Sequence, residues 1–383
     1  MSEKEIILKA LNGYYYGFDK TDSVDISDVD SLFKISRQHK ILPIVFSQLC
    51  NSVSELIDKN NYDSLKKETL GQTAIQVKND SGLIQVCKLF DENSIPYAVC
   101  KGAACRAMYR NPELRISCDE DILINGEYIE SAKDILVNFG FEILKKGNSE
   151  IDFVKDTLRI ELQSRFDADR ECVDINNMIF EGIGGDKFRY DYAEIPTLYP
   201  DSGFVMMSVH FYKHFVRGGI GIRQTMDLIK YADINKEKID FDRCFDVIDK
   251  ISGKKLIKTV LTIGNLYFDT DFKVAVDKKL ADEFLDDIFN SGAYGRANSV
   301  REHSGTYTKR FAANNGRRLS SLIKTVFPDK KMILKKNPEL NTLGKRIKFR
   351  TGRFASFYKE EKKLEFIKFG FRRERLLKKL GIN

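Results

Sequence analysis

The chain has 383 residues and a formal net charge of +7, with 42% hydrophobic and 31% charged residues, which is typical of a soluble globular protein of two or three domains. No apolar run approaches the roughly 18 residues of a membrane span, and the start, Met-Ser-Glu-Lys-Glu, lacks the features of a signal peptide, so we expect a cytoplasmic protein. Seven cysteines without a CxxC pair argue against a disulfide framework or a zinc site.

Residues 1–92 are predicted to be a helical region. Ser2 and Glu5 have the spacing of a capping box. Apolar residues recur at helical period over 35–49, where Pro43 starts a new helix, and over 75–90. No ligand-like cluster occurs here, so we interpret the region as a packing module.

Residues 93–195 are predicted to form the core, because strand patterns alternate with helical ones and then give a hairpin. The sequence therefore predicts an α+β fold, in which a small mixed sheet is flanked by N- and C-terminal helical regions. The predicted elements are strands at 95–100, 121–124, 141–144, 150–154 and 157–163, and helices at 102–110 and 128–139.

Two aspartates lead into the second of these strands. Asp119 and Asp121 are two residues apart, so a strand would point both carboxylates to one side. Hard oxygen ligands suit Mg²⁺, and a Mg²⁺ pair is what transfer of a nucleotidyl group needs. The Lys101-Gly102 turn lies one short helix earlier, where backbone N–H groups and a cation can meet phosphates.

This arrangement resembles the nucleotidyltransferase superfamily of the DNA polymerase β type. Within it, the pattern looks like a poorly characterised bacterial family. A lone Asp-x-Asp is common by chance, but the whole combination, with a strand on each side, is fairly specific. The residues that carry the resemblance are Lys101, Gly102, Tyr109, Pro112, Arg115, Asp119 and Asp121.

The resemblance implies a third carboxylate on a neighbouring strand, which binds the catalytic metal and helps to activate the attacking hydroxyl. Glu161 is the candidate, because alternation places Ile160 and Leu162 on the core side and Glu161 on the other face. Asp152, on the preceding strand, is the rival. The family often has His two residues after this acid, and Gln163 at that position puts a proton-transfer role there in doubt.

The resemblance also implies a binding site for the triphosphate of an NTP such as ATP. Gly102 would permit close backbone approach and Lys101 would pair with the phosphates; the alternative is an ordinary turn. Arg115 either grips a phosphate bidentately or pairs with Glu113 or Glu120.

Residues 196–310 are predicted to be a second helical region, with two pairs of polar residues at i,i+4 spacing. His210 and His214 share a helix face, and the alternatives are zinc, which lacks a third ligand nearby, substrate contact, or core and surface packing. Arg223 and Asp227 form either an ion pair worth a few tenths of a kcal/mol or, as the resemblance implies, a nucleotide contact with a supporting acid.

Residues 311–383 are predicted to be a basic tail. Residues 320–383 hold 19 Lys and Arg against 6 Asp and Glu, a net charge of +13, whereas the rest of the chain has a net charge of −6. Phenylalanines are interleaved with the basic residues. The tail is therefore a helix packed on the body, a nucleic-acid contact or a contact with an anionic membrane, and 345–383 is the candidate polyanion contact.

The favoured hypothesis is a Mg²⁺-dependent nucleotidyltransferase that uses two metal ions and an NTP and releases pyrophosphate. Its acceptor is a small molecule, a protein or RNA, and the sequence does not choose among them. One alternative is an inactive binding or regulatory module, which Gln163 and the unusual Lys-Gly turn favour. The other is a nucleic-acid-binding protein that acts through its tail.

Overall fold

The computed structural model divides the chain into two compact units. One comprises Met1–His210 with Arg223–Ala275, and the other comprises Phe211–Ile222 with Val276–Asn383. Among the residues that the structure describes, no helix combines the length and the apolar character needed to cross a membrane. The described residues are 1–18, 24–147, 149–165, 173–217, 219–274, 276–293, 342, 344–345 and 372–382.

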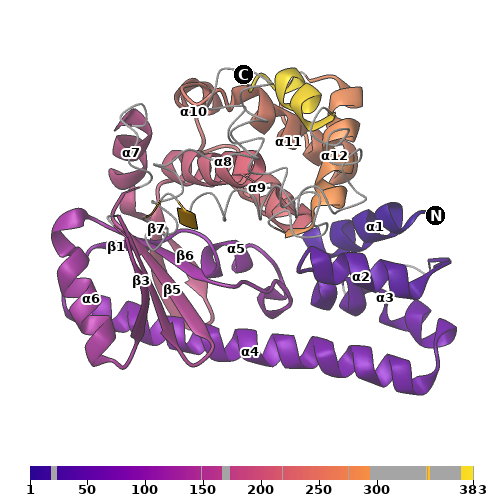
Figure 1. The fold of residues 1–383 in the computed structure, drawn as a ribbon, viewed down its shortest axis with the longest axis horizontal. Helices are drawn as coiled ribbons and strands as arrows, with labels where there is room; N and C mark the ends of the chain where they lie inside the picture. Colours follow the sequence, from indigo (N-terminus) through magenta and orange to yellow (C-terminus); the bar gives the residue numbers. More distant parts are fainter. Residues whose placement is uncertain are drawn as a thin grey trace. The chain divides into compact units, whose positions relative to one another are not determined.

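The fold is α+β, as predicted (Figure 1). The α-helices are α1 (Glu3–Tyr15), α2 (Val29–Gln38), α3 (Leu42–Leu56), α4 (Lys59–Glu92), α5 (Ala103–Arg106), α6 (Ile129–Asn138), α7 (Val173–Phe180), α8 (Pro200–Arg217), α9 (Ile222–Ile234), α10 (Phe241–Asp249), α11 (Lys254–Tyr267) and α12 (Lys278–Ser291). Two 3-10 turns are η1 (Pro112–Leu114) and η2 (Gly126–Tyr128). The strands are β1 (Tyr97–Val99), β2 (Glu120–Ile124), β3 (Glu142–Lys146), β4 (Glu150–Lys155), β5 (Leu158–Gln163), β6 (Ile183–Tyr190) and β7 (Ala193–Leu198).

The N-terminal region is helical, and its local signals work as expected. The capping box is present, because the Glu5 backbone N–H donates to Ser2 Oγ and the Ser2 backbone N–H donates to the Glu5 carboxylate. Pro43 lies in the first turn of α3, where its missing N–H costs nothing. The periodic segment 75–90 is the second half of α4, the long helix that extends from the other N-terminal helices to the sheet (Figure 1).

The main sheet is mixed and has the strand order β1-β2-β5-β4-β3. Strands β2 and β5 are parallel neighbours, and the other pairs in this sheet are antiparallel. The 150–163 hairpin was predicted, and its strands pair in register from Glu150–Gln163 to Lys155–Leu158. Because β5 lies beside β2, the hairpin brings its polar residues next to the two aspartates.

One hydrophobic core joins α4 and α6 to this sheet. From α4 it includes Leu83, Ile84 and Phe90, which pack with the inward-facing residues of the central strands. At the far end of the strands, the Asn79 side chain of α4 also bonds both the hydroxyl and the carbonyl oxygen of Thr157. The helix therefore covers one face of the sheet, whereas Asp121 of β2 and Glu161 of β5 lie on the other face.

A second sheet, formed by β6 and β7, was not predicted. The two antiparallel strands meet at a turn where Asp191 has a positive φ of 54°. Tyr190 and Ile195 join the main core. The alternation in β6 is masked by two glycines at its start, Gly184 and Gly185, so the strand pattern is weak in the sequence.

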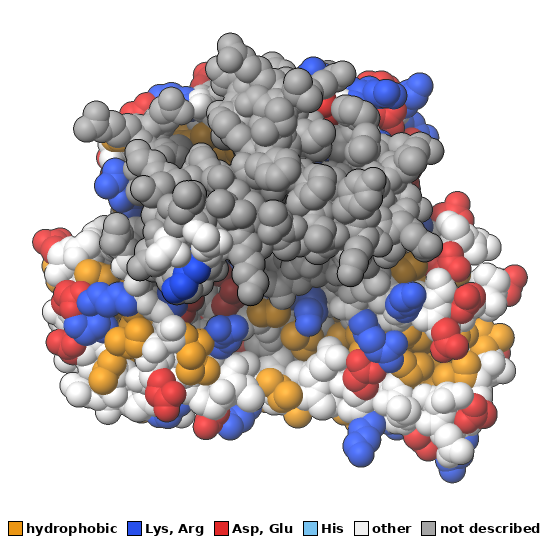
Figure 2. All heavy atoms as spheres, in the orientation of Figure 1, with side chains coloured by type: hydrophobic (Ala, Val, Ile, Leu, Met, Phe, Trp, Pro, Cys, Tyr) orange, Lys and Arg blue, Asp and Glu red, His pale blue; other side chains and the backbone are white. Residues whose placement is uncertain are grey.

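In the second unit, helical residues 372–379 pack through the buried side chains of Leu376 and Leu377. Arg373 is also buried, where it pairs with Asp287 and donates to the Phe215 carbonyl oxygen. Most of the predicted basic tail lies outside the described residues. In Figure 2 the Lys/Arg and Asp/Glu side chains of described residues are interspersed over the visible surface.

Candidate functional site

Two acids lie side by side on the parallel strands β2 and β5. Asp121 and Glu161 are direct partners in the register, and their neighbours Ile122 and Leu162 are buried in the core. Asp121 is 5% exposed and Glu161 is partly buried. Asp119 is the residue before β2 begins and is also partly buried. The structure thus brings the three predicted acids to one end of two neighbouring strands.

Lys101 and Gln163 bind the acids in this structure. The Lys101 ammonium lies 2.7 Å from Asp121 Oδ1. The Gln163 side-chain nitrogen donates to the same Asp121 oxygen at 3.1 Å and to Glu161 Oε1 at 2.6 Å. One amide therefore links the two carboxylates, and one lysine supplies the nearest positive charge.

The carboxylates are held in an environment that disfavours their charge. Burial raises the pKa of Asp121 to about 7, with the charges of Asp119 and Glu161 adding to the rise and Lys101 opposing it. Burial also raises the pKa of Glu161. Burial acts to lower the pKa of Lys101, but Asp121 and the other acids outweigh it, so the pKa is raised and the side chain stays an ammonium.

Asp152, the rival for the third position, lies on the other side of Glu161. Asp152 is in β4, where it is the register partner of Glu161 in β5 and of Lys145 in β3. Its Oδ1 is buried with no hydrogen-bond partner among the described residues. Glu161 and Asp152 were alternatives for the third acid in the prediction from the sequence. The strand register places both of them in one cross-strand row with Asp121.

The donor set fits Mg²⁺ in kind, because it consists of carboxylate oxygens on rigid strands. Burial is the main cause of the raised pKa of Asp121, and a cation bound beside this carboxylate would favour its charged form. Among the described residues, no three acidic, His or Cys side chains are already arranged around one point. A metal ion there would have to take the place of the Lys101 and Gln163 contacts.

Glu120, which lies between the two aspartates, points to the opposite face and holds the Lys101-Gly102 turn. Its Oε2 accepts the backbone N–H of Ala103 at 2.7 Å, and its Oε1 accepts the Ser117 hydroxyl at 2.8 Å. Gly102 has a positive φ of 57°, and a Cβ built there would lie 2.0 Å from Glu120 Oε2. In this structure the group that closely approaches the glycine is the Glu120 carboxylate, and the approach of a phosphate stays a prediction.

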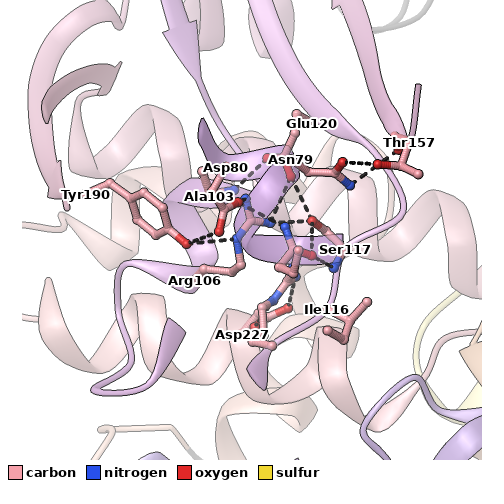
Figure 3. Close-up of polar contacts among 12 residues, drawn as sticks. Asn79, Asp80, Ala103, Arg106, Ile116, Ser117, Glu120, Thr157, Tyr190 and Asp227 are labelled. Carbon is pink, nitrogen blue, oxygen red and sulfur yellow. Dashed lines mark hydrogen bonds and ion pairs between the residues drawn. The ribbon is translucent and has the colours of Figure 1, made fainter. Parts of the chain in front are cut away.

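Glu120 belongs to a buried polar network that reaches α4 (Figure 3). Arg106, which is fully buried, pairs with Glu120 at 2.8 Å and with Asp80 of α4. The Tyr190 hydroxyl donates to Asp80 at 2.5 Å and accepts from Arg106. Buried charges are tolerated when they are paired and hydrogen-bonded, and here the pairing fixes the turn to the strand that carries the aspartates.

Gly102→Ala is expected to destabilise the protein by about 2 kcal/mol or more, because it adds strain at positive φ and breaks the Ala103–Glu120 hydrogen bond. Gly71→Ala is the matched control. Gly71 lies in α4, and a Cβ added there would meet open space, so alanine should stabilise the protein by up to about 1 kcal/mol. Denaturant unfolding of both variants measures the difference, and equal stabilities would contradict the role given to Gly102.

Arg115 does not pair with Glu113 or Glu120, and both of these predicted alternatives are wrong. Its guanidinium binds Asp227 in α9 through two contacts, at 2.6 Å and 3.2 Å, and both residues are buried. The Tyr109 hydroxyl donates to the same carboxylate at 3.2 Å. Arg115 and Asp227 are 112 positions apart, so this pair could not be seen from local spacing.

Asp227→Asn is expected to destabilise the protein by about 3 kcal/mol or more, because it leaves the buried Arg115 charge without a counter-charge. Asp156→Asn is the matched control, since Asp156 pairs with Lys78 at an exposed turn and asparagine tolerates its positive φ of 53°. The control should change stability by less than about 1 kcal/mol. Similar urea midpoints for the two variants would contradict the prediction.

The helix-surface pair predicted between Arg223 and Asp227 is also not what the structure shows. Both residues are buried, and Arg223 donates to the Ile116 carbonyl oxygen. Arg223 Nε and Arg115 Nη1 are buried without a hydrogen-bond partner among the described residues. The contacts of the two arginines therefore tie the 115–116 segment to α9, and each arginine retains one nitrogen that donates to no described residue.

His210 and His214 lie four residues apart in α8, and both are partly buried. The structure gives no metal-type cluster around them within its described residues. Their substrate role stays a prediction.

Glu120, Arg106 and Asp80 were not predicted from the sequence to be parts of the site. A signal for Glu120 existed, because alternation turns the residue between Asp119 and Asp121 towards the covered face of the sheet, where a charge needs a partner.

One comparison with known proteins identifies a family. The model of a family described as "Uncharacterised nucleotidyltransferase" matches residues 25–269, which is more than half of the chain. The matched region contains the Lys101-Gly102 turn and the three acids. No curated protein matches the chain.

Proposed function

Because the chain belongs to the uncharacterised nucleotidyltransferase family, we propose that it is a Mg²⁺-dependent enzyme that moves a nucleoside monophosphate from an NTP to an acceptor hydroxyl or phosphate. The observation that carries the proposal is the register pair of Asp121 and Glu161 beside the Lys101 ammonium. Asp119, Asp121 and Glu161 are the proposed metal ligands. When bound, Mg²⁺ would supply charge neutralisation and a template for in-line displacement.

In the proposed reaction, some side chains act on the acceptor and others bind the triphosphate. The acceptor oxygen forms a bond to the α-phosphorus, the bond to pyrophosphate breaks, and a Glu161 carboxylate oxygen takes the proton of an acceptor hydroxyl. Lys101, the Gly102 turn, Arg115 and Arg223 are proposed to face the phosphates. This proposal is supported by the positions of the three cations. Lys101, Arg115 and Arg223 all lie close enough to the buried Cys105 thiol to act on it electrostatically.

Asp227 is proposed to act through Arg115, which it holds by two contacts. His210 and His214 are proposed as acceptor contacts, because they lie on α8, which lies entirely within the family-matched region. The acceptor remains a small molecule, a protein side chain or RNA.

The proposal is tested by incubating the protein with each α-labelled NTP, Mg²⁺ and a cell extract. Label is then scored on protein, RNA and small molecules, with pyrophosphate release as the second readout. We expect label on one acceptor class and none with Asp121→Asn.

An inactive binding module is the second candidate, and the Gln163 amide that links Asp121 to Glu161 favours it. Thermal melting with each NTP, with and without Mg²⁺, separates the two candidates. A stabilisation by nucleotide that does not depend on metal, together with no pyrophosphate release, would favour the module and contradict the enzyme.

A further inference from the structure

We infer that Lys101 is an internal counter-ion that occupies the metal-binding side of Asp121 and competes with the divalent cation for this carboxylate. The inference rests on the proposed function, because it takes Asp121 as a metal ligand. It adds a property of Lys101 itself, which the proposed function uses only as a phosphate contact.

The first observation is the ion pair between Lys101 and Asp121. The two side chains are 14% and 6% exposed, and Lys101 Nζ lies 2.7 Å from Asp121 Oδ1. Coulomb interactions at such partly buried positions are screened much less than at the surface. The pair is therefore a defined contact and not a transient pair between mobile surface side chains.

The second observation is that the same carboxylate oxygen is fully used. Asp121 Oδ1 accepts from Lys101 and also from Gln163, and a carboxylate oxygen has about two lone pairs. A divalent cation bound to this oxygen would lie close to the ammonium and would be repelled by it. Metal binding and the Lys101 contact therefore exclude each other at Oδ1.

The third point is that the side chain of Lys101 is long enough for its charge to change partners while the backbone stays in place. Lys101 lies between the end of β1 and Gly102, and its charge sits at the end of a flexible four-carbon side chain. Its backbone is held by the turn that Glu120 fixes, because the next N–H but one, that of Ala103, bonds Glu120. The ammonium can therefore leave Asp121 without movement of the backbone, and the phosphates of a bound NTP would offer it a new partner.

Titration of the nucleotide-free protein with Mn²⁺, followed by electron paramagnetic resonance of the free ion, tests the inference without any assay of activity. Lys101→Met removes the competing charge and keeps an unbranched chain. We expect it to bind Mn²⁺ about tenfold or more tightly than the wild type does. An affinity equal to or weaker than that of the wild type would overturn the inference.

Lys145→Met is the matched control. Lys145 also acts on Glu161 and Asp152, but it is 57% exposed and its partner is Glu150, so its removal should change Mn²⁺ affinity much less. An equal gain in both variants would show a general charge effect and would overturn the specific role of Lys101. Asp121→Asn distinguishes a failure of the Lys101 inference from a failure of the proposed metal site. If this variant binds Mn²⁺ as the wild type does, Asp121 is not a metal ligand and the proposed site fails as well.

A measurement on the wild-type protein tests the inference even if the Lys101→Met variant does not fold. Acetylation of Lys101 by an amine-reactive reagent, quantified by mass spectrometry, should become faster when Mn²⁺ is added, because the ammonium is released from Asp121. A rate that falls or stays constant at saturating Mn²⁺ would overturn the inference.

Discussion

Asp121→Asn is expected to lower nucleotidyl transfer by at least about a thousandfold, which corresponds to about 4 kcal/mol of transition-state stabilisation. Asp121 is the most buried of the three acids, and its carboxylate lies between Lys101 and the Gln163 amide that also bonds Glu161. Steady-state turnover at saturating Mg²⁺ and NTP measures the effect.

The same substitution should change the melting temperature by only a few degrees. Asparagine removes the repulsion among the crowded acids, and this gain offsets the loss of the contact with Lys101. Asp119→Asn should behave similarly. Wild-type turnover in the double variant would contradict the assignment of both aspartates.

Glu161→Gln is expected to keep NTP binding and to lose turnover by about a hundredfold or more, because the attacking hydroxyl is no longer activated. The nucleotide is still bound, since Asp119 and Asp121 are intact. Isothermal titration with a non-hydrolysable NTP, together with the turnover number, separates binding from chemistry.

Asp152→Asn is the control for this prediction, because Asp152 is the register partner of Glu161 and faces the same side of the sheet. We expect it to retain most of the turnover. If Asp152→Asn loses as much activity as Glu161→Gln, Asp152 and not Glu161 is the third acid.

The local features of the core could be predicted from the sequence because each depends on a short-range signal. Alternation of Ile160 and Leu162 with Glu161 predicted the strand β5 and the side chain that faces away from the core, and the structure has this pattern. The hairpin turn consists of Asp156 and Thr157, between the paired residues Lys155 and Leu158. The placement of Glu161 beside Asp121 was expected from the resemblance, which implied a third carboxylate on a neighbouring strand.

The contacts of the site could not be predicted because they join distant parts of the chain. Arg115 finds Asp227 only after α9 packs near the 115–116 segment, and Lys101 finds Asp121 only after β1 pairs with β2. Several carboxylates were available to each cation in the sequence. Packing, and not spacing, decides among them.

The buried pair of Arg106 and Asp80 bears on how the protein can be divided. Asp80 lies on α4, before residue 93 where the predicted core begins, and Arg106 lies after it. A fragment that starts at residue 93 would leave Arg106 without one of its counter-charges and would expose core residues such as Ile160 that face α4. The smallest version of this core that folds on its own must therefore include α4, so the helix and the sheet form one structural module.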